Sequence, residues 1–471
     1  MIVLLFIISL VTPYYGSTDV DEYAGSAKFF AGMYNADIRA SHSMFFGFVH
    51  APLVLAFGSF LGIKIVNLII LSLIIFSVYW ISGKDKRALF LILASPLIWY
   101  MGPWINPIQI AGLLFLWGFF FMEKFDKDGK MNYVIYSGIL IGLAGVFWNT
   151  VIYIFVFLLI AFFYNRNVNS VVVFALSFIV GLLPLFIFEQ YMFGFFLFSI
   201  TKTVASNVMA SVSGGGIYSG QELLRTSALV GYLAFLVMVP LFIYTFFLRK
   251  NFVENKRAVI FMTLVLLFYL INPQIRYLIF LYPIFVLYLA KILTKKKFLI
   301  QASIFVILSL LVINPYLVQT KYSTDSLEFG SVVGNFGNWE FEAREDKKIL
   351  KDLSGILMIY RGESFVVGPE SDRYAELAFL YWGNDVGEFV SIQDYNLAIR
   401  DDKVLFEKRF ETSSSIDNRR QIWIEGGMSR NPREDTDYDS IKYAISFDRN
   451  LGLEEFELIE SYEKLFLFEK K

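Results

Sequence analysis

The chain has 471 residues, no cysteine and two histidines, which excludes disulfides and thiolate chemistry and disfavours a histidine-based metal site. Apolar residues make up 56% of the chain, 51 residues are Phe, and the mean hydropathy is +0.57, values that exclude an ordinary soluble enzyme. Apolar runs long enough for a hydrocarbon layer of ~30 Å recur up to about residue 314. The composition therefore predicts a polytopic membrane protein.

The net charge of −1 conceals two unlike parts. Residues 1–315 hold 21 Lys and Arg against 11 Asp and Glu, whereas residues 316–471 hold 20 against 31. We therefore expect a mainly α transmembrane domain over 1–315, followed by a polar domain over 316–471 that is long enough to fold alone.

The predicted spans begin with "MIVLLFIISLV", which we interpret as a short retained span because no positive segment precedes it, as a secretory signal would require. Eleven spans are expected, at about 2–15, 64–82, 88–101, 107–122, 132–147, 149–164, 170–188, 227–248, 258–272, 277–294 and 298–314.

Basic residues are concentrated in alternate connectors, such as "GKDKR" (83–87), "EKFDKDGK" (123–130) and "KILTKKK" (291–297). The positive-inside rule places these connectors and the N-terminus in the cytoplasm, and the C-terminal domain outside. This orientation requires that residues 44–62 do not span, so we expect a helix there that lies at the outer interface or dips in and out.

The C-terminal domain mixes a helical period over 344–360 with short strand-like runs, which predicts a small α/β or α+β domain. The strand-like runs are "SFVVG" (364–368), "QIWIEG" (421–426), "KYAISF" (442–447) and "KLFLFEK" (464–470).

Polar side chains of the membrane part gather on the predicted outer face. Three carboxylates, Asp19, Asp21 and Glu22, cluster directly after the first span, and both histidines, His42 and His50, follow in the same outer loop. The cations available on that face are Lys28, Arg39, Lys202, Arg225 and Arg276.

Such a face suits transfer of a sugar from a lipid phosphate. The acceptor hydroxyl needs a carboxylate base within hydrogen-bond reach, and the departing phosphate needs Arg or Lys to hold its charge. The segment "TKTVASNVMASVSGGGIYSGQELL" (201–224) is either a connector or a flap that orders over the donor.

Three motifs in order, "DVDEYAGSAKFFAG" (19–32), "HAPLVLAFGSFLG" (50–62) and "NPQIRYLIFLYP" (272–283), resemble the GT-C superfamily of integral-membrane glycosyltransferases. The resemblance is to the branch of protein O-mannosyltransferases and the lipid A aminoarabinose transferase, and it covers roughly residues 1–315. It implies a polyprenyl- or dolichyl-phosphate-linked sugar donor and an extracytoplasmic protein, lipid or glycan acceptor.

Carried over by position, the resemblance makes Asp21, Asp19 or Glu22 the catalytic base, or the ligand of a divalent cation such as Mg or Mn, the one cofactor left open. The residues that it implies for substrate binding are His50, His42, Arg39, Lys28, Lys202, Arg225, Arg276 and Tyr277. Two family prolines are replaced here, by Ala51 and Phe280, and Tyr23 follows the acidic pair directly.

The tail lacks the Trp-Trp-Asp motif of the superfamily's oligosaccharyltransferases, which favours a single sugar as the transferred group. We expect direct displacement at the sugar carbon, with inversion of its configuration. The expected partners are the lipid-linked donor, the acceptor and membrane lipids, without nucleic acid.

Plainer interpretations remain beside these. The acidic cluster also fits a helix N-cap, His50 a packed interfacial residue and Arg276 a membrane-edge anchor. At the level of the whole chain the alternatives are a transporter or lipid flippase, and a membrane anchor that presents the tail. Transporters usually carry charges near mid-membrane, whereas these spans have few ionisable residues.

Overall fold

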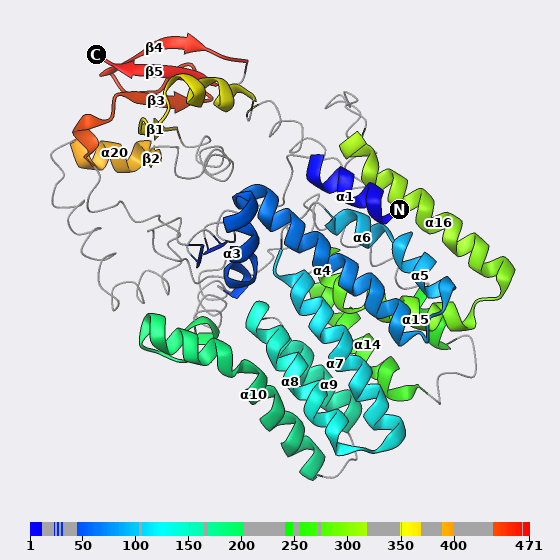
Figure 1. Ribbon diagram of the computed structural model, residues 1–471. Helices are drawn as coiled ribbons and strands as arrows, with labels where there is room; N and C mark the ends of the chain where they lie inside the picture. The colour runs from blue at the N-terminus through cyan, green and yellow to red at the C-terminus, as the bar shows by residue number, and fades with distance from the viewer. Residues whose placement is uncertain are drawn as a thin grey trace.

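The fold was analysed in a computed structural model. It describes residues 1–11, 23, 26–27, 30–31, 45–102, 106–149, 151–163, 168–201, 241–247, 255–271, 275–317, 349, 351–368, 389–399, 437–463 and 465–471. A helical part comes first, and a small sheet formed by the last hundred or so residues follows it (Figure 1).

The helical part is built from apolar helices joined by short connectors. Its helices are α1 (Ile2–Val11), α3 (Phe45–Phe57), α4 (Ser59–Ile81), α5 (Lys86–Leu93), α6 (Pro96–Met101), α7 (Ile108–Asp128), α8 (Met131–Phe147), α9 (Val151–Phe163), α10 (Val168–Phe193), the π-helix η2 (Ile243–Phe247), α14 (Lys256–Ile271), the 3-10 helix η3 (Ile275–Phe280), α15 (Tyr282–Ile292) and α16 (Lys295–Leu317).

Within the described part, three helices are long and apolar enough to cross a membrane: Leu61–Ile81, Ile108–Asp128 and Val168–Tyr191. Helices α8, α9 and α14 lie within two residues of the predicted spans 132–147, 149–164 and 258–272. Most of the predicted span 227–248 lies outside the described residues. The number of eleven spans stays a prediction.

The predicted span 88–101 is two helices instead of one. Ser95 has ψ 126°, the extended conformation that a residue before proline prefers, so the helix stops and Pro96 begins α6. The carbonyls freed at the break are bonded from elsewhere: Trp99 Nε1 donates to Leu93 O at 2.8 Å, and Ser309 Oγ of α16 donates to Ala94 O at 2.7 Å. A similar break separates η3 from α15, just before Pro283.

Helix α3 occupies the segment expected at the interface. Its 13 residues reach about 20 Å at 1.5 Å per residue, short of the ~30 Å layer. Gly58, with φ 80°, then reverses the chain into α4, and Gly62 lies so close to the Leu53 carbonyl that a side chain would not fit.

Helices α8 and α10 approach each other through glycine. A Cβ on Gly142 or Gly181 would fall less than 3.0 Å from the backbone of the opposite helix. Small residues at such crossings allow the close backbone approach on which helix association in a membrane depends.

The C-terminal sheet has the strand order β2-β1-β3-β5-β4, with β1 parallel to β2 and β3 and the other neighbours antiparallel. Its strands are β1 (Phe365–Val367), β2 (Phe389–Ser391), β3 (Tyr443–Ser446), β4 (Phe456–Ser461) and β5 (Phe466–Lys470), accompanied by α20 (Ile392–Ile399) and the short 3-10 helix η6 (Tyr438–Ser440).

Both faces of the sheet are covered, because alternate residues of its central strands enter two separate cores. Phe365 and Ile445 pack with the helical stretch 351–359, whereas Val366 and Ala444 pack with Tyr395 of α20. The predicted mixture of helix and strand is confirmed. Of the predicted strands, "QIWIEG" (421–426) lies outside the described residues.

Candidate active site at the predicted outer face

The first outer loop packs against α3 just after its carboxylates. Ser26 touches Gly47 so closely that a Cβ on this glycine would collide with the Ser26 backbone. The ring of Tyr23 lies 5.2 Å from that of Phe46, and Ala27 is fully buried. Tyr23 and Ser26, one and four residues after Glu22 in sequence, thus lie against α3.

His50 lies on the same helix and is fully buried. Its ring stacks on Phe46 with centroids 3.7 Å apart, and its Nδ1 lies 2.6 Å from the Phe46 carbonyl oxygen. Nδ1 therefore carries the proton and donates it, while Nε2 is left as an acceptor with no hydrogen-bond partner among the described residues. The substrate-binding role of His50 stays a prediction.

A buried polar network connects neighbouring ends of α1, α4 and α6. Lys64 of α4 donates from Nζ to the Ser9 carbonyl of α1 at 2.7 Å. Ser9 Oγ donates to Gly102 O at 2.8 Å. Because Ser9 lies in the last turn of α1, its carbonyl has no partner within the helix, and the Lys64 amino group satisfies it.

The other end of this network closes the turn between α6 and α7. Asn67 Nδ2 donates to Gly102 O at 3.1 Å, and Gln109 Nε2 donates to Met101 O at 2.9 Å. Asn106 Oδ1 accepts from the Ile108 backbone N–H at 2.9 Å and so caps the start of α7. Side-chain amides thus take up the backbone groups that the break between the two helices exposes.

Two further residues mark the same end of the helical part. Tyr277 of η3 lies 6.1 Å, ring to ring, from Trp148 at the end of α8. Glu189, near the end of α10, accepts hydrogen bonds at Oε1 from the backbone N–H and the hydroxyl of Ser199. Its Oε2 is buried without a partner among the described residues. Glu189 therefore caps a helical turn.

Of the predicted site residues, the structure places His50 and Tyr277, and the backbone of Arg276 in η3. The others lie outside the described residues: Asp19, Asp21, Glu22, Lys28, Arg39, His42, Lys202 and Arg225. Their roles stay predictions.

Sequence reasoning did not identify Lys64, Asn67 and Gln109 as a connected group. The signal was present, since each is an isolated polar residue near the outer end of an apolar segment. Such residues inside a membrane are costly unless hydrogen-bonded, and they usually have a specific role. Helix α4 begins five residues before the predicted span, so Lys64 lies inside a helix instead of at its border.

Neither a protein-family model nor a curated protein matches the chain. Among solved structures, the aminoarabinose transferase ArnT from Cupriavidus metallidurans bound to undecaprenyl phosphate aligns with a TM-score of 0.61 at 13% identity, covering 99% of this chain and 96% of that one. ArnT in the apo state aligns with a TM-score of 0.55 at 12% identity. At such identities the likeness establishes the fold, and it confirms the GT-C-like fold expected from the motifs. With this fold and its apolar helices, the chain is an integral, multi-pass membrane protein.

Proposed function

We propose that the protein is a membrane glycosyltransferase that moves a monosaccharide from a polyprenyl-phosphate donor to an extracytoplasmic acceptor. The observation that carries this proposal is the structural likeness to ArnT bound to undecaprenyl phosphate, which extends over 99% of the chain. The likeness takes in the polar C-terminal part as well as the helices, and three sequence motifs support it in the same order.

In the proposed reaction, a hydroxyl of the acceptor attacks the anomeric carbon of the sugar. One new carbon–oxygen bond forms there as the bond from that carbon to the phosphate oxygen breaks, which inverts the configuration. The hydroxyl proton passes to a carboxylate, for which Asp19, Asp21 and Glu22 are the candidates. The phosphate leaves on its lipid with its charge held by outer basic residues, with Arg276 the foremost candidate.

The described residues supply the frame for this chemistry. The Lys64–Ser9 bond fixes the end of α1 ten residues before Asp19, and the docking of Ser26 on Gly47 fixes the chain four residues after Glu22. The chain is thus fixed at Ser9 and at Ser26, on either side of the acidic cluster in sequence, and a base must be positioned within hydrogen-bond distance of its substrate. Alternatively, the same carboxylates coordinate a divalent cation instead of acting as a base.

We place the catalytic part in residues 1–315 and the extracytoplasmic domain in residues 316–471. The basic connectors at the opposite helix ends support this orientation.

The test uses purified full-length protein with radiolabelled undecaprenyl-phosphate sugars and an extract of envelope acceptors. We expect label to move into acceptor, and the variant with Asp19→Asn, Asp21→Asn and Glu22→Gln together to be inactive but folded. Asp37→Asn, an outer carboxylate of the same loop outside the cluster, is the matched control and should keep activity. Full activity of the triple variant would refute the role of the cluster, and absence of transfer to every acceptor would refute the function.

A further inference from the structure

At the helix ends opposite the candidate active site, a cavity of about 70 Å³ opens between α4, α7 and α15. One water molecule needs about 10–15 Å³ of this kind of volume, so the cavity has room for a group the size of a phosphate. Its polar lining consists of Glu123, Lys124 and Lys127 of α7 with Tyr288 and Lys291 of α15. Helical spacing produces this wall, because residues three or four apart share one face.

Cations exceed carboxylates in the lining, with three lysines against Glu123. The Lys124 ammonium lies over the rings of Phe120 and Tyr133, at 4.7 and 5.5 Å. Lys127 and Lys291 make no salt bridge within 4.0 Å among the described residues. The nearby Asp126 is bound by Arg257 of α14. Within the lining, Glu123 interacts electrostatically with both Lys127 and Lys291, and the three lysines still outnumber this carboxylate.

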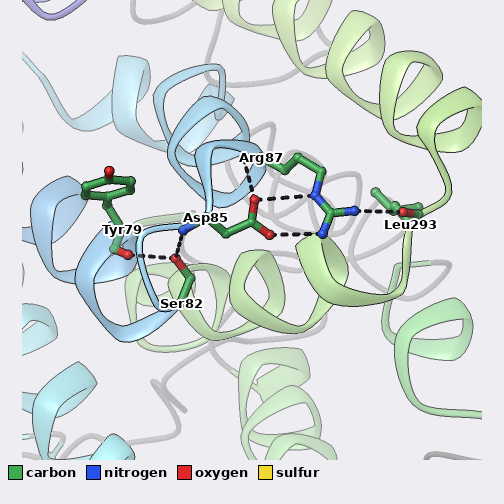
Figure 2. A network of polar contacts seen from close by, with 5 residues as sticks. All are labelled: Tyr79, Ser82, Asp85, Arg87 and Leu293. Atoms are coloured by element: carbon green, nitrogen blue, oxygen red, sulfur yellow. Dashed lines mark hydrogen bonds and ion pairs between the residues drawn. The ribbon is translucent and has the colours of Figure 1, made fainter.

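A polar network connects the turn after α4 and the start of α5 to the end of α15 (Figure 2). Asp85 caps α5 by accepting from the Arg87 backbone N–H at 2.8 Å, and its carboxylate pairs with the Arg87 guanidinium at 3.1 Å. The same guanidinium donates to the Leu293 carbonyl at 3.3 Å. The turn after Ile81 of α4 is thus tied to the end of α15, two residues beyond Lys291, so the cavity is a built feature and not a gap between mobile ends.

The rest of the lining is hydrocarbon, from Ile81, Phe120 and Leu287. These apolar side chains add no binding free energy for a free inorganic anion, whereas the acyl chains of a lipid can pack against them. The cavity also lies at the end where the basic connectors 83–87, 123–130 and 291–297 meet, which is the membrane surface that attracts anionic head groups.

We propose that this cavity binds the phosphate of an anionic phospholipid in the leaflet on the side of the basic connectors. Lys127 and Lys291 hold the phosphate, Tyr288 lies beside it, and the first acyl carbons pack on Ile81, Phe120 and Leu287. This site is separate from the proposed donor site, which lies at the opposite helix ends.

The test is native mass spectrometry of the full-length protein in neutral detergent. We expect phosphatidylglycerol to remain bound under activation that removes phosphatidylcholine. Loss of a direct hydrogen bond to a charged group weakens binding by about tenfold or more, so Lys127→Gln with Lys291→Gln should weaken phosphatidylglycerol binding by roughly 100-fold. The matched control is Lys130→Gln with Lys296→Gln, two exposed lysines of the same connectors outside the lining.

Equal retention of both lipids, or equal losses in the lysine pair and its control, would overturn the proposal. Displacement of phosphatidylglycerol by inorganic phosphate at constant ionic strength would assign the cavity to free phosphate and overturn the lipid assignment. Circular dichroism without lipid checks that the variants fold. If the double variant fails to fold, Lys127→Gln alone is measured, because this residue is exposed and loss of its direct contact should still weaken binding by about tenfold. Glycosyl transfer is not measured, so the outcome is independent of the proposed function.

Discussion

Lys64 and Ser9 are 55 residues apart in sequence, yet Lys64 Nζ lies 2.7 Å from the Ser9 carbonyl oxygen. This contact connects the last turn of α1 to α4, just before the chain enters the segment that carries three carboxylates.

Lys64→Met tests that contact. The substitution keeps an unbranched side chain but leaves a buried carbonyl without its donor, which costs about 1–3 kcal/mol. We expect a lower thermal midpoint of the purified protein and a lower turnover, because the end of α1 loses its attachment. Lys295→Met, at an exposed lysine, is the control. An unchanged midpoint would mean that the bond does not hold α1 in place.

Single substitutions separate the three candidate bases. Loss of a general base lowers the rate by about 10²–10⁴-fold, so one of Asp19→Asn, Asp21→Asn and Glu22→Gln should reduce kcat to that extent, and the other two should stay within a few-fold of the parent. Transfer of label from the lipid-linked sugar is the measurement. Equal small losses in all three would indicate a helix cap in place of a base.

His50→Phe distinguishes a packing role from a binding role. Phenylalanine can keep the stacking on Phe46, but it removes the acceptor at Nε2 and the donor at Nδ1. We expect kcat/KM to fall at least tenfold, a loss of about 1.4 kcal/mol in transition-state stabilisation, with the thermal midpoint nearly unchanged. A large fall of the midpoint with normal kcat/KM would assign His50 to packing alone.

Gly142→Leu tests the contact between α8 and α10. A side chain at this position meets the Phe178 carbonyl and Gly181, so the helices must separate. Overpacking of this kind costs typically about 1–3 kcal/mol. We expect a lower thermal midpoint and increased aggregation in detergent, read by size-exclusion chromatography. Leu140→Val, a half-buried position one half-turn away, should change the midpoint far less.

Sequence patterns located the helices α8, α9 and α14 and the strands β1, β3 and β5, because long apolar runs and short alternating runs are local signals. The interruption at Ser95 was visible in principle, since Pro96 restricts the residue before it. Apolar character on both sides of the proline nevertheless predicted one continuous span.

The polar network around Lys64 could not be predicted from local sequence patterns. Whether Lys64 is a membrane-edge residue or a buried donor depends on Ser9 lying against it, and only the packing of α1 on α4 brings the two together. The order and spacing of three motifs did predict the GT-C-like fold. Several motifs in a fixed order along the chain are informative about the whole fold, whereas the pattern of one helix is not.

The bond from Ser309 to the Ala94 carbonyl has a consequence for movement. Helix α16 is the last helix before the C-terminal part, and this bond attaches it to the interruption between α5 and α6. Sliding α16 along its own axis would break the bond and leave a buried carbonyl unsatisfied, whereas rotation about Ser309 would preserve it. The bond therefore opposes sliding of α16 past the interruption more than it opposes rotation about Ser309.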